Sequence, residues 1–296
     1  MTSNRKALTE KLDRIMALAY NMPPEENVFS YNGVLYPVVL CSPETFEALE
    51  SFEARSDDVL LAGYPKSGKY LLFLLPLLQV KIHFIKCTNF HFLLSLQRIK
   101  KLPFRRVLAT HLLPGCLPTS VFKNNAKILM LTRNPKDVAV SYFHFSNGMP
   151  LLPSFKTWDE FFSAFMCGEV VWGSYFDYMI EWNKHINNKN IMCTTYEELK
   201  ENLILGVKKI TEFFEFSLTE EELQAVVDRS SFQAMKENSH RTHGTFGNIL
   251  FRKGAIGDWK TLFTETQNQE MERKFEECLA ETKLGVKIKY KEYCKA

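Results

Sequence analysis

The chain lacks any apolar stretch long enough to cross a membrane. Its longest apolar run, residues 71–78, contains Pro76 and is less than half as long as a transmembrane helix of about 20 residues. The N-terminal residues carry mixed charges and show no apolar core of a secretory signal. We therefore predict a cytoplasmic protein that does not associate with membranes.

Cysteine is present but follows no pattern. The seven cysteines are odd in number and widely separated in sequence, which argues against both a disulfide framework and a zinc site. This distribution is typical of a protein from a reducing compartment. We expect neither disulfides nor a bound metal.

Acidic residues are missing from residues 59–136, which contain 13 lysines and arginines. The net charge of the whole chain is only +3, which is too small to indicate nucleic-acid binding. A local positive field of this kind indicates a small polyanionic ligand. With 296 residues, 46% of them hydrophobic, the chain can bury the core of one large α/β domain or of two small ones.

Short apolar runs recur along the chain, and helical patterns fill the intervals between them. Such runs are typical of the buried strands of a parallel sheet. They predict strands at residues 34–40, 59–63, 106–110, 128–132 and 190–194. Capping boxes predict helix starts at Thr157…Glu160, Thr195…Glu198 and Thr219…Glu222. The alternation predicts an α/β fold, a three-layer sandwich with a central parallel sheet and a P-loop-like nucleotide site.

The first motif directly follows a predicted strand and reads Gly63-Tyr64-Pro65-Lys66-Ser67-Gly68. A strand that ends in a glycine-rich turn with one lysine is typical of loops that bind phosphoryl groups. Gly68 is followed by Lys69 as in a P-loop, but Tyr70 replaces the Ser or Thr that would hold magnesium. A nucleotide kinase therefore stays an alternative.

A second anion-binding motif lies far along the chain, in Arg252-Lys253-Gly254-Ala255-Ile256-Gly257-Asp258-Trp259-Lys260. Two adjacent cations followed by two glycines can surround a phosphate with charge and backbone N–H groups. Arg133 ends a predicted strand, Ser141 lies in the helix after it, and both can reach a phosphate. Two anion sites this far apart predict a nucleotide with a phosphate at each end.

Four predicted strands are followed by polar side chains that suit such a ligand, namely Lys66, His111, Arg133 and Tyr196. Because the carboxyl ends of parallel strands meet at one edge of the sheet, we expect these side chains to converge there. A neutral histidine is suited to removing a proton from a hydroxyl group. Taken alone, a single histidine is more often an ordinary partly buried residue, and it is the position of His111 at a strand end that favours a catalytic role.

Three motifs, at residues 64–68, 133–141 and 252–260, occur in the order and spacing of the cytosolic sulfotransferases. The chain resembles this family from about Phe29 to Tyr293 and is most similar to its family 6B. The resemblance implies a single sulfotransferase domain over residues 1–296. It also implies transfer of a sulfuryl group from 3′-phosphoadenosine 5′-phosphosulfate to the hydroxyl or amine of a small lipophilic acceptor, without a metal.

The resemblance also implies roles for individual residues. His111 is expected to be the general base, and Lys66 is expected to stabilise the leaving group. The expected co-substrate ligands are Lys66, Ser67, Gly68, Arg133, Ser141, Tyr196, Ser230, Phe232, Met235, Arg252, Lys253 and Gly254.

The chain departs from the family pattern in two regions. Lys69, Tyr70 and Leu71 replace two small hydroxyl residues and a tryptophan that stacks on adenine, and the atypical segment 69–101 suggests an alternative or misassigned exon. A nucleotide-binding relative without turnover therefore stays an alternative. Near the C-terminus, Glu265 replaces a valine of the family's dimer motif, so we expect any homodimer to be weakened.

Overall fold

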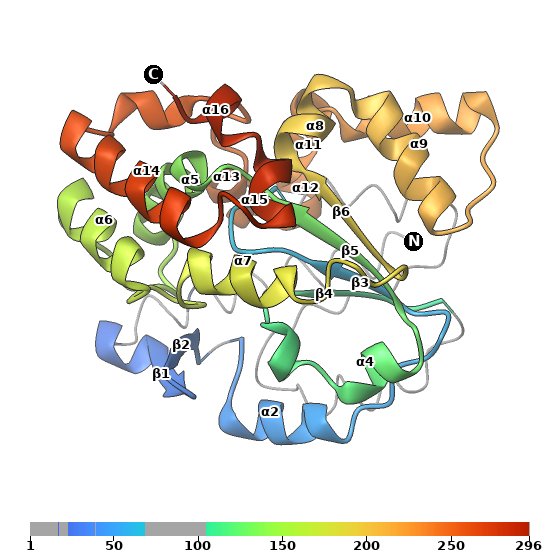
Figure 1. Ribbon diagram of the computed structural model, residues 1–296, viewed down its shortest axis with the longest axis horizontal. Coiled ribbons are helices and arrows are strands. Elements are labelled where there is room, and N and C mark those ends of the chain that lie inside the picture. Colours follow the sequence, from blue (N-terminus) through green and yellow to red (C-terminus); the bar gives the residue numbers. More distant parts are fainter. Residues whose placement is uncertain (1–16, 18–22, 39, 69–104, 296) are drawn as a thin grey trace.

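The computed structural model describes residue 17 and residues 23–38, 40–68 and 105–295 (Figure 1). Its strands are β1 (Val28–Tyr31), β2 (Val34–Pro37), β3 (Val59–Ala62), β4 (Val107–Thr110), β5 (Lys127–Thr132) and β6 (Ile191–Thr195). Its helices and 3₁₀ turns are η1 (Pro24–Asn27), α2 (Pro43–Glu50), η3 (Pro114–Cys116), α4 (Thr119–Lys123), α5 (Pro135–Gly148), α6 (Trp158–Cys167), α7 (Tyr175–Asn183), α8 (Tyr196–Glu201), α9 (Leu203–Phe213), α10 (Glu220–Ser230), α11 (Phe232–Glu237), α12 (Ser239–His243), α13 (Phe246–Leu250), η4 (Asp258–Thr261), α14 (Glu265–Cys278), α15 (Lys283–Ile288) and α16 (Tyr290–Tyr293). None of the helices in these described ranges is long and apolar enough to cross a membrane.

Four strands form one parallel sheet in the order β4-β3-β5-β6. The parallel sheet and four of the predicted strands are therefore confirmed. The fifth prediction, residues 34–40, is wrong about both length and partner, because β2 pairs antiparallel with β1 in a separate two-stranded sheet. Asn32 and Gly33, which join the two strands, both have positive φ, as a tight two-residue hairpin turn requires.

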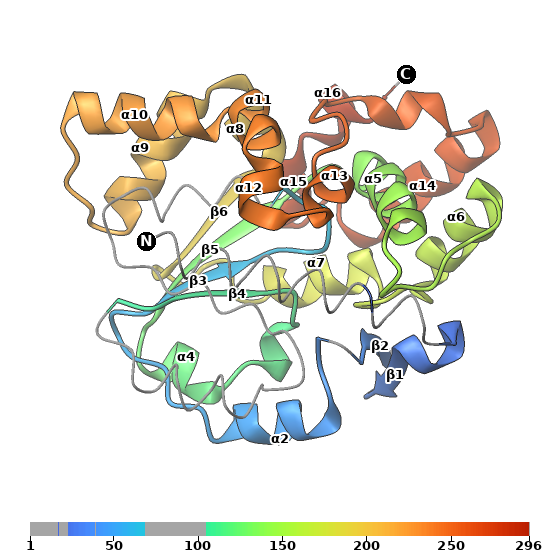
Figure 2. The ribbon, with the colours of Figure 1, turned by 180° about the vertical axis from the view of Figure 1, so that it is seen from behind.

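Helices cover both faces of the parallel sheet (Figures 1 and 2). Side chains alternate along β3, so Leu60 and Ala62 pack in a large cluster with residues of α5, α6, α7 and α14. Val59 and Leu61 pack on the other face with residues of α8, α9 and α10. The α/β layering expected from the sequence is thus present.

The predicted capping boxes mark true helix starts. Thr195 and Thr219 each accept the N–H of the glutamate three residues later, and each glutamate binds the backbone N–H of its threonine. Thr157 caps α6 in the same way, but the side chain of Glu160 accepts the N–H of Lys156 instead. The box at Thr157…Glu160 is therefore only half formed.

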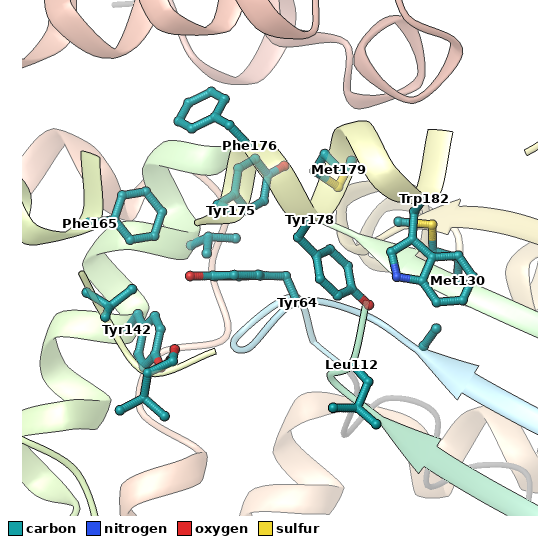
Figure 3. Close-up of a cluster of buried hydrophobic side chains, with 14 of the residues drawn as sticks. Tyr64, Leu112, Met130, Tyr142, Phe165, Tyr175, Phe176, Tyr178, Met179 and Trp182 are labelled. Carbon is teal, nitrogen blue, oxygen red and sulfur yellow. Dashed lines mark hydrogen bonds between the residues drawn. The ribbon is translucent and has the colours of Figure 1, made fainter. Parts of the chain in front are cut away.

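A buried group of tyrosines anchors the loop that follows β3. Figure 3 shows Tyr64 among Tyr142, Tyr175 and Tyr178, with ring centroids 5.4–6.1 Å from its own. The hydroxyl of Tyr64 donates a hydrogen bond of 2.6 Å to the carbonyl of Gly173. Because Tyr64 is the second residue of the first motif, this packing fixes the position of the motif beyond the end of β3.

Candidate active site

The first motif, residues 63–68, forms a loop that turns sharply at the carboxyl end of β3; it is called the first loop below. Lys66 and Gly68 both have positive φ, +66° and +88°. A Cβ atom on Gly68 would lie 2.5 Å from the ring of Tyr196, so the close approach of loop and ring requires glycine. The Oγ atom of Ser67 is buried and has no hydrogen-bond partner among the described residues. A buried hydroxyl without a partner here is what a site for a polar ligand requires.

His111 follows β4, the strand beside β3. Its Nδ1 atom lies 2.7 Å from the carbonyl oxygen of Gly63, and its ring centroid lies 5.1 Å from that of Trp172. A carbonyl oxygen only accepts, so this contact requires the proton on Nδ1, and a neutral ring then carries its lone pair on Nε2. The histidine is therefore held in the tautomer that can remove a proton through Nε2.

Arg133 follows β5 and joins the segments around it. Its Nη2 atom donates a hydrogen bond of 2.9 Å to the carbonyl of Ala255 and lies 3.5 Å from a carboxylate oxygen of Asp137. The guanidinium stacks over the ring of Tyr196 at 4.2 Å, and a longer contact of 3.4 Å reaches the carbonyl of Lys66. Its Nε atom is buried and has no hydrogen-bond partner among the described residues.

The second anion-binding motif, residues 252–260, is called the second loop below. It brings two cations and a glycine to the same region. Arg252 and Lys253 both form ion pairs with the carboxylate of Asp258, and Lys253 Nζ lies 2.5 Å from Asp258 Oδ1. Gly254 has a φ of +65°, and a Cβ there would lie 2.2 Å from the ring of Phe232. The structure thus brings Phe232 and Gly254, 22 positions apart in sequence, into direct contact.

Lys66 lies close enough to other cations to be affected by their charge. Burial, followed by the charges of Arg133 and Arg252, lowers the pKa of Lys66 to about 7. Its Nζ lies 4.2 Å from the ring centroid of Phe145, and it has no carboxylate partner among the described residues. A bound anion would reverse this effect, because an opposite charge nearby favours the charged amine.

A family model for the sulfotransferase domain matches residues 56–283 of the chain. The chain belongs to the sulfotransferase family. It is 53% identical to mouse Sulfotransferase 6B1 over 275 residues, which cover 90% of this chain and 91% of that protein. It is 46% identical to the human Sulfotransferase 6B1 over 303 residues, which cover 99% of each.

Solved structures agree with this assignment. A crystal structure of mouse sulfotransferase SULT7A1 complexed with PAP matches with a TM-score of 0.84 and 34% identity, covering 92% of this chain and 100% of that chain. A retinol dehydratase structure matches with a TM-score of 0.73 at 18% identity and supports the fold alone. The recognition of the family from its three motifs is confirmed.

The remaining predicted ligands of this sulfotransferase lie on the helices around the two loops. Tyr196 begins α8 directly after β6, and Met235 packs against both hydrophobic clusters. Ser141 is half-buried on α5. Ser230 ends α10 and donates its hydroxyl hydrogen to the carbonyl of Val226 in the same helix. The structure thus places Tyr196 in direct contact with the first loop, whereas the Ser230 hydroxyl is bonded within its own helix.

Sequence reasoning missed three residues of this sulfotransferase site. Phe145 packs on Lys66, Trp172 packs on His111, and Asp137 binds the second loop. Phe145 had a usable signal, because it lies four residues after Ser141 and therefore on the same face of α5. Asp137 lies inside the motif at residues 133–141, but nothing in that motif indicated its contact with the second loop. Trp172 had no signal, since its contact comes from a distant part of the chain.

Proposed function

We propose that this sulfotransferase moves a sulfuryl group from 3′-phosphoadenosine 5′-phosphosulfate to the hydroxyl or amine of a small lipophilic acceptor. The observation that carries the proposal is the link between His111 and the first loop. His111 Nδ1 is bound to the carbonyl of Gly63, three residues before Lys66. A general base and a cation for the leaving group are therefore attached to the same short loop.

The residues present fit the co-substrate. Ser67 Oγ and Arg133 Nε are buried polar atoms without partners in the described part of the chain, and Lys66 has no counter-charge there. When bound, the co-substrate would supply an activated sulfuryl group. His111 Nε2 would take the proton of the acceptor hydroxyl, and Lys66 would stabilise the negative charge on the departing phosphate oxygen.

The two ends of the nucleotide would occupy the two loops. Lys66, Ser67 and Gly68 would hold the 5′ end. The 3′-phosphate ligands would be Arg133, Ser141, Arg252, Lys253 and Gly254, and the adenine would lie among Tyr196, Ser230, Phe232 and Met235. No three His, Cys, Asp or Glu side chains in the described ranges come together to hold a metal ion. Transfer without a metal stays a prediction.

Turnover and binding measured together test the proposal. The His111→Ala variant should lose about 10²- to 10⁴-fold in sulfuryl transfer, the usual contribution of a general base. Its affinity for adenosine 3′,5′-bisphosphate should change by less than about twofold, because the base acts on the acceptor. His240→Ala is the matched control, since His240 is an exposed histidine outside the proposed ligand set.

The outcomes separate the alternatives. Turnover of His111→Ala close to that of the wild type would contradict the assigned base. A wild type that binds the bisphosphate but turns over no acceptor would indicate the silent relative, whose signal at residues 69–71 lies outside the described residues. Binding of magnesium–ATP without binding of the bisphosphate would indicate the kinase.

A further inference from the structure

Asp137 lies in the first turn of α5, is 1% exposed, and binds the second loop through both carboxylate oxygens. Oδ2 accepts the N–H of Gly257 and Oδ1 accepts the N–H of Trp259, each at 2.9 Å. These donors lie 120 and 122 positions further along the chain. One buried carboxylate therefore ties the second loop to the start of α5.

The same carboxylate holds Arg133. Arg133 Nη2 lies 3.5 Å from Asp137 Oδ2 and also donates to the carbonyl of Ala255 inside the second loop. Arg133, Asp137 and the second loop thus each contact the other two. Any movement of Asp137 would shift Arg133 and the loop relative to each other.

Further side chains fix the orientation of the carboxylate. Asn134 Nδ2 donates 3.0 Å to Asp137 Oδ2, and Asn134 Oδ1 accepts the N–H of Asp137. Asn134 is itself held by the buried Glu197, whose Oε1 accepts both its backbone N–H and its Nδ2. The aspartate is therefore preorganised by the N-cap residue of its own helix, which Glu197 of α8 holds in turn.

We propose that Asp137 is a positioning residue that sets the affinity for the 3′-phosphate without touching it. This inference rests on the proposed function. Protein donors occupy both oxygens of Asp137, and a carboxylate in direct contact with a phosphate would repel it. Asp137 therefore acts through Arg133 and through the loop that carries Arg252 and Lys253, which are the proposed phosphate ligands.

Two ligands that differ only in the 3′-phosphate test this role. Calorimetry would compare adenosine 3′,5′-bisphosphate with adenosine 5′-monophosphate on the wild type and on Asp137→Asn. The variant should bind the bisphosphate about 10- to 100-fold more weakly, as expected for losing a buried hydrogen bond to a charged group. Its affinity for the monophosphate should change by less than about threefold, because that ligand lacks the positioned group.

Asp177→Asn is the matched control. Asp177 also lies in the first turn of a helix, α7, but it is exposed, and its N–H is capped by Ser174. Its substitution should leave both affinities within about twofold, as usual for a surface change. If Asp137→Asn weakens both ligands equally, or neither, the positioning role is wrong.

If Asp137→Asn fails to fold, a measurement on the wild type still tests the inference. The amides of Gly257 and Trp259 should be protected from hydrogen exchange in the ligand-free protein, because both donate to Asp137. Exchange at the rate of open amides would overturn the inference. A wild type that does not prefer the bisphosphate to the monophosphate would contradict the proposed function, and this inference with it.

Discussion

The affinity for adenosine 3′,5′-bisphosphate should fall as the pH rises above 7, because of Lys66. The pKa of its amine is lowered to about 7 in the ligand-free protein, and a bound phosphate should return it towards its ordinary value near 10.5. Binding is then coupled to proton uptake, so affinity is full below pH 7 and is lost between the free and the bound pKa. With these values the dissociation constant should rise roughly 50-fold between pH 7 and 9.

Calorimetry over this range measures both the affinity and the protons taken up. At pH 8 the complex should take up roughly 0.9 proton, read from the dependence of the enthalpy on buffer ionisation. The second pKa of a phosphate, about 6, lies below the window and does not produce this signal. Lys66→Arg keeps its charge throughout and should give a flat profile. A flat profile for the wild type, or an equal slope for Lys66→Arg, would refute the reasoning.

Three further substitutions separate the site from the scaffold. Gly254→Ala should weaken bisphosphate binding about tenfold by calorimetry, because it strains a left-handed backbone and places a Cβ 2.2 Å from the ring of Phe232; unchanged affinity would contradict this contact. Asp58→Asn should lower the free energy of unfolding in urea by about 3–5 kcal/mol, since it leaves Arg106 charged with both side chains only 1% exposed. Glu215→Gln removes an exposed ion pair and should cost less than about 1 kcal/mol; equal losses would contradict the role of burial.

The parallel sheet was predictable because its strands are buried on both faces. The residues of β3 and β5 are almost all buried, so each reads as a continuous apolar run. The prediction for residues 34–40 was wrong because an apolar run alone does not identify a partner. Asn32-Gly33 was the available signal for a hairpin, and Pro37 for the end of its second strand.

The dimer motif shows how a local preference can explain a departure from a family pattern. The side chain of Thr264 caps α14 by accepting the N–H of Gln267. The side chain of Gln267 in turn accepts the backbone N–H of Thr264. Glu265 then occupies the first helical turn and is exposed, where a negative charge is favourable to the helix dipole. The weakened homodimer expected from Glu265 stays a prediction.

The site was predictable only as far as short motifs carry chemistry. Lys66 and Arg133 could be assigned because each follows a strand, and strand ends converge. The ring of Trp172 contacts that of His111, and the backbone of Trp172 has a φ of +72°; no local motif indicated either feature. Phe and Tyr residues could not be divided between core and site, since Tyr64 and Phe145 differ in what surrounds them and not in sequence pattern.

We expect Asp258, inside the second loop, and Asp137, beside it, to have opposite consequences for phosphate binding. Asp258 pairs with Arg252 and Lys253 themselves, so we expect its carboxylate to compete with a phosphate for these cations. The oxygens of Asp137 instead accept the backbone N–H groups of Gly257 and Trp259, so those two donors are not available to a phosphate. If the phosphate binds these cations, its net affinity should include the cost of competing with Asp258. We expect Asp137 to set the geometry in which that competition takes place.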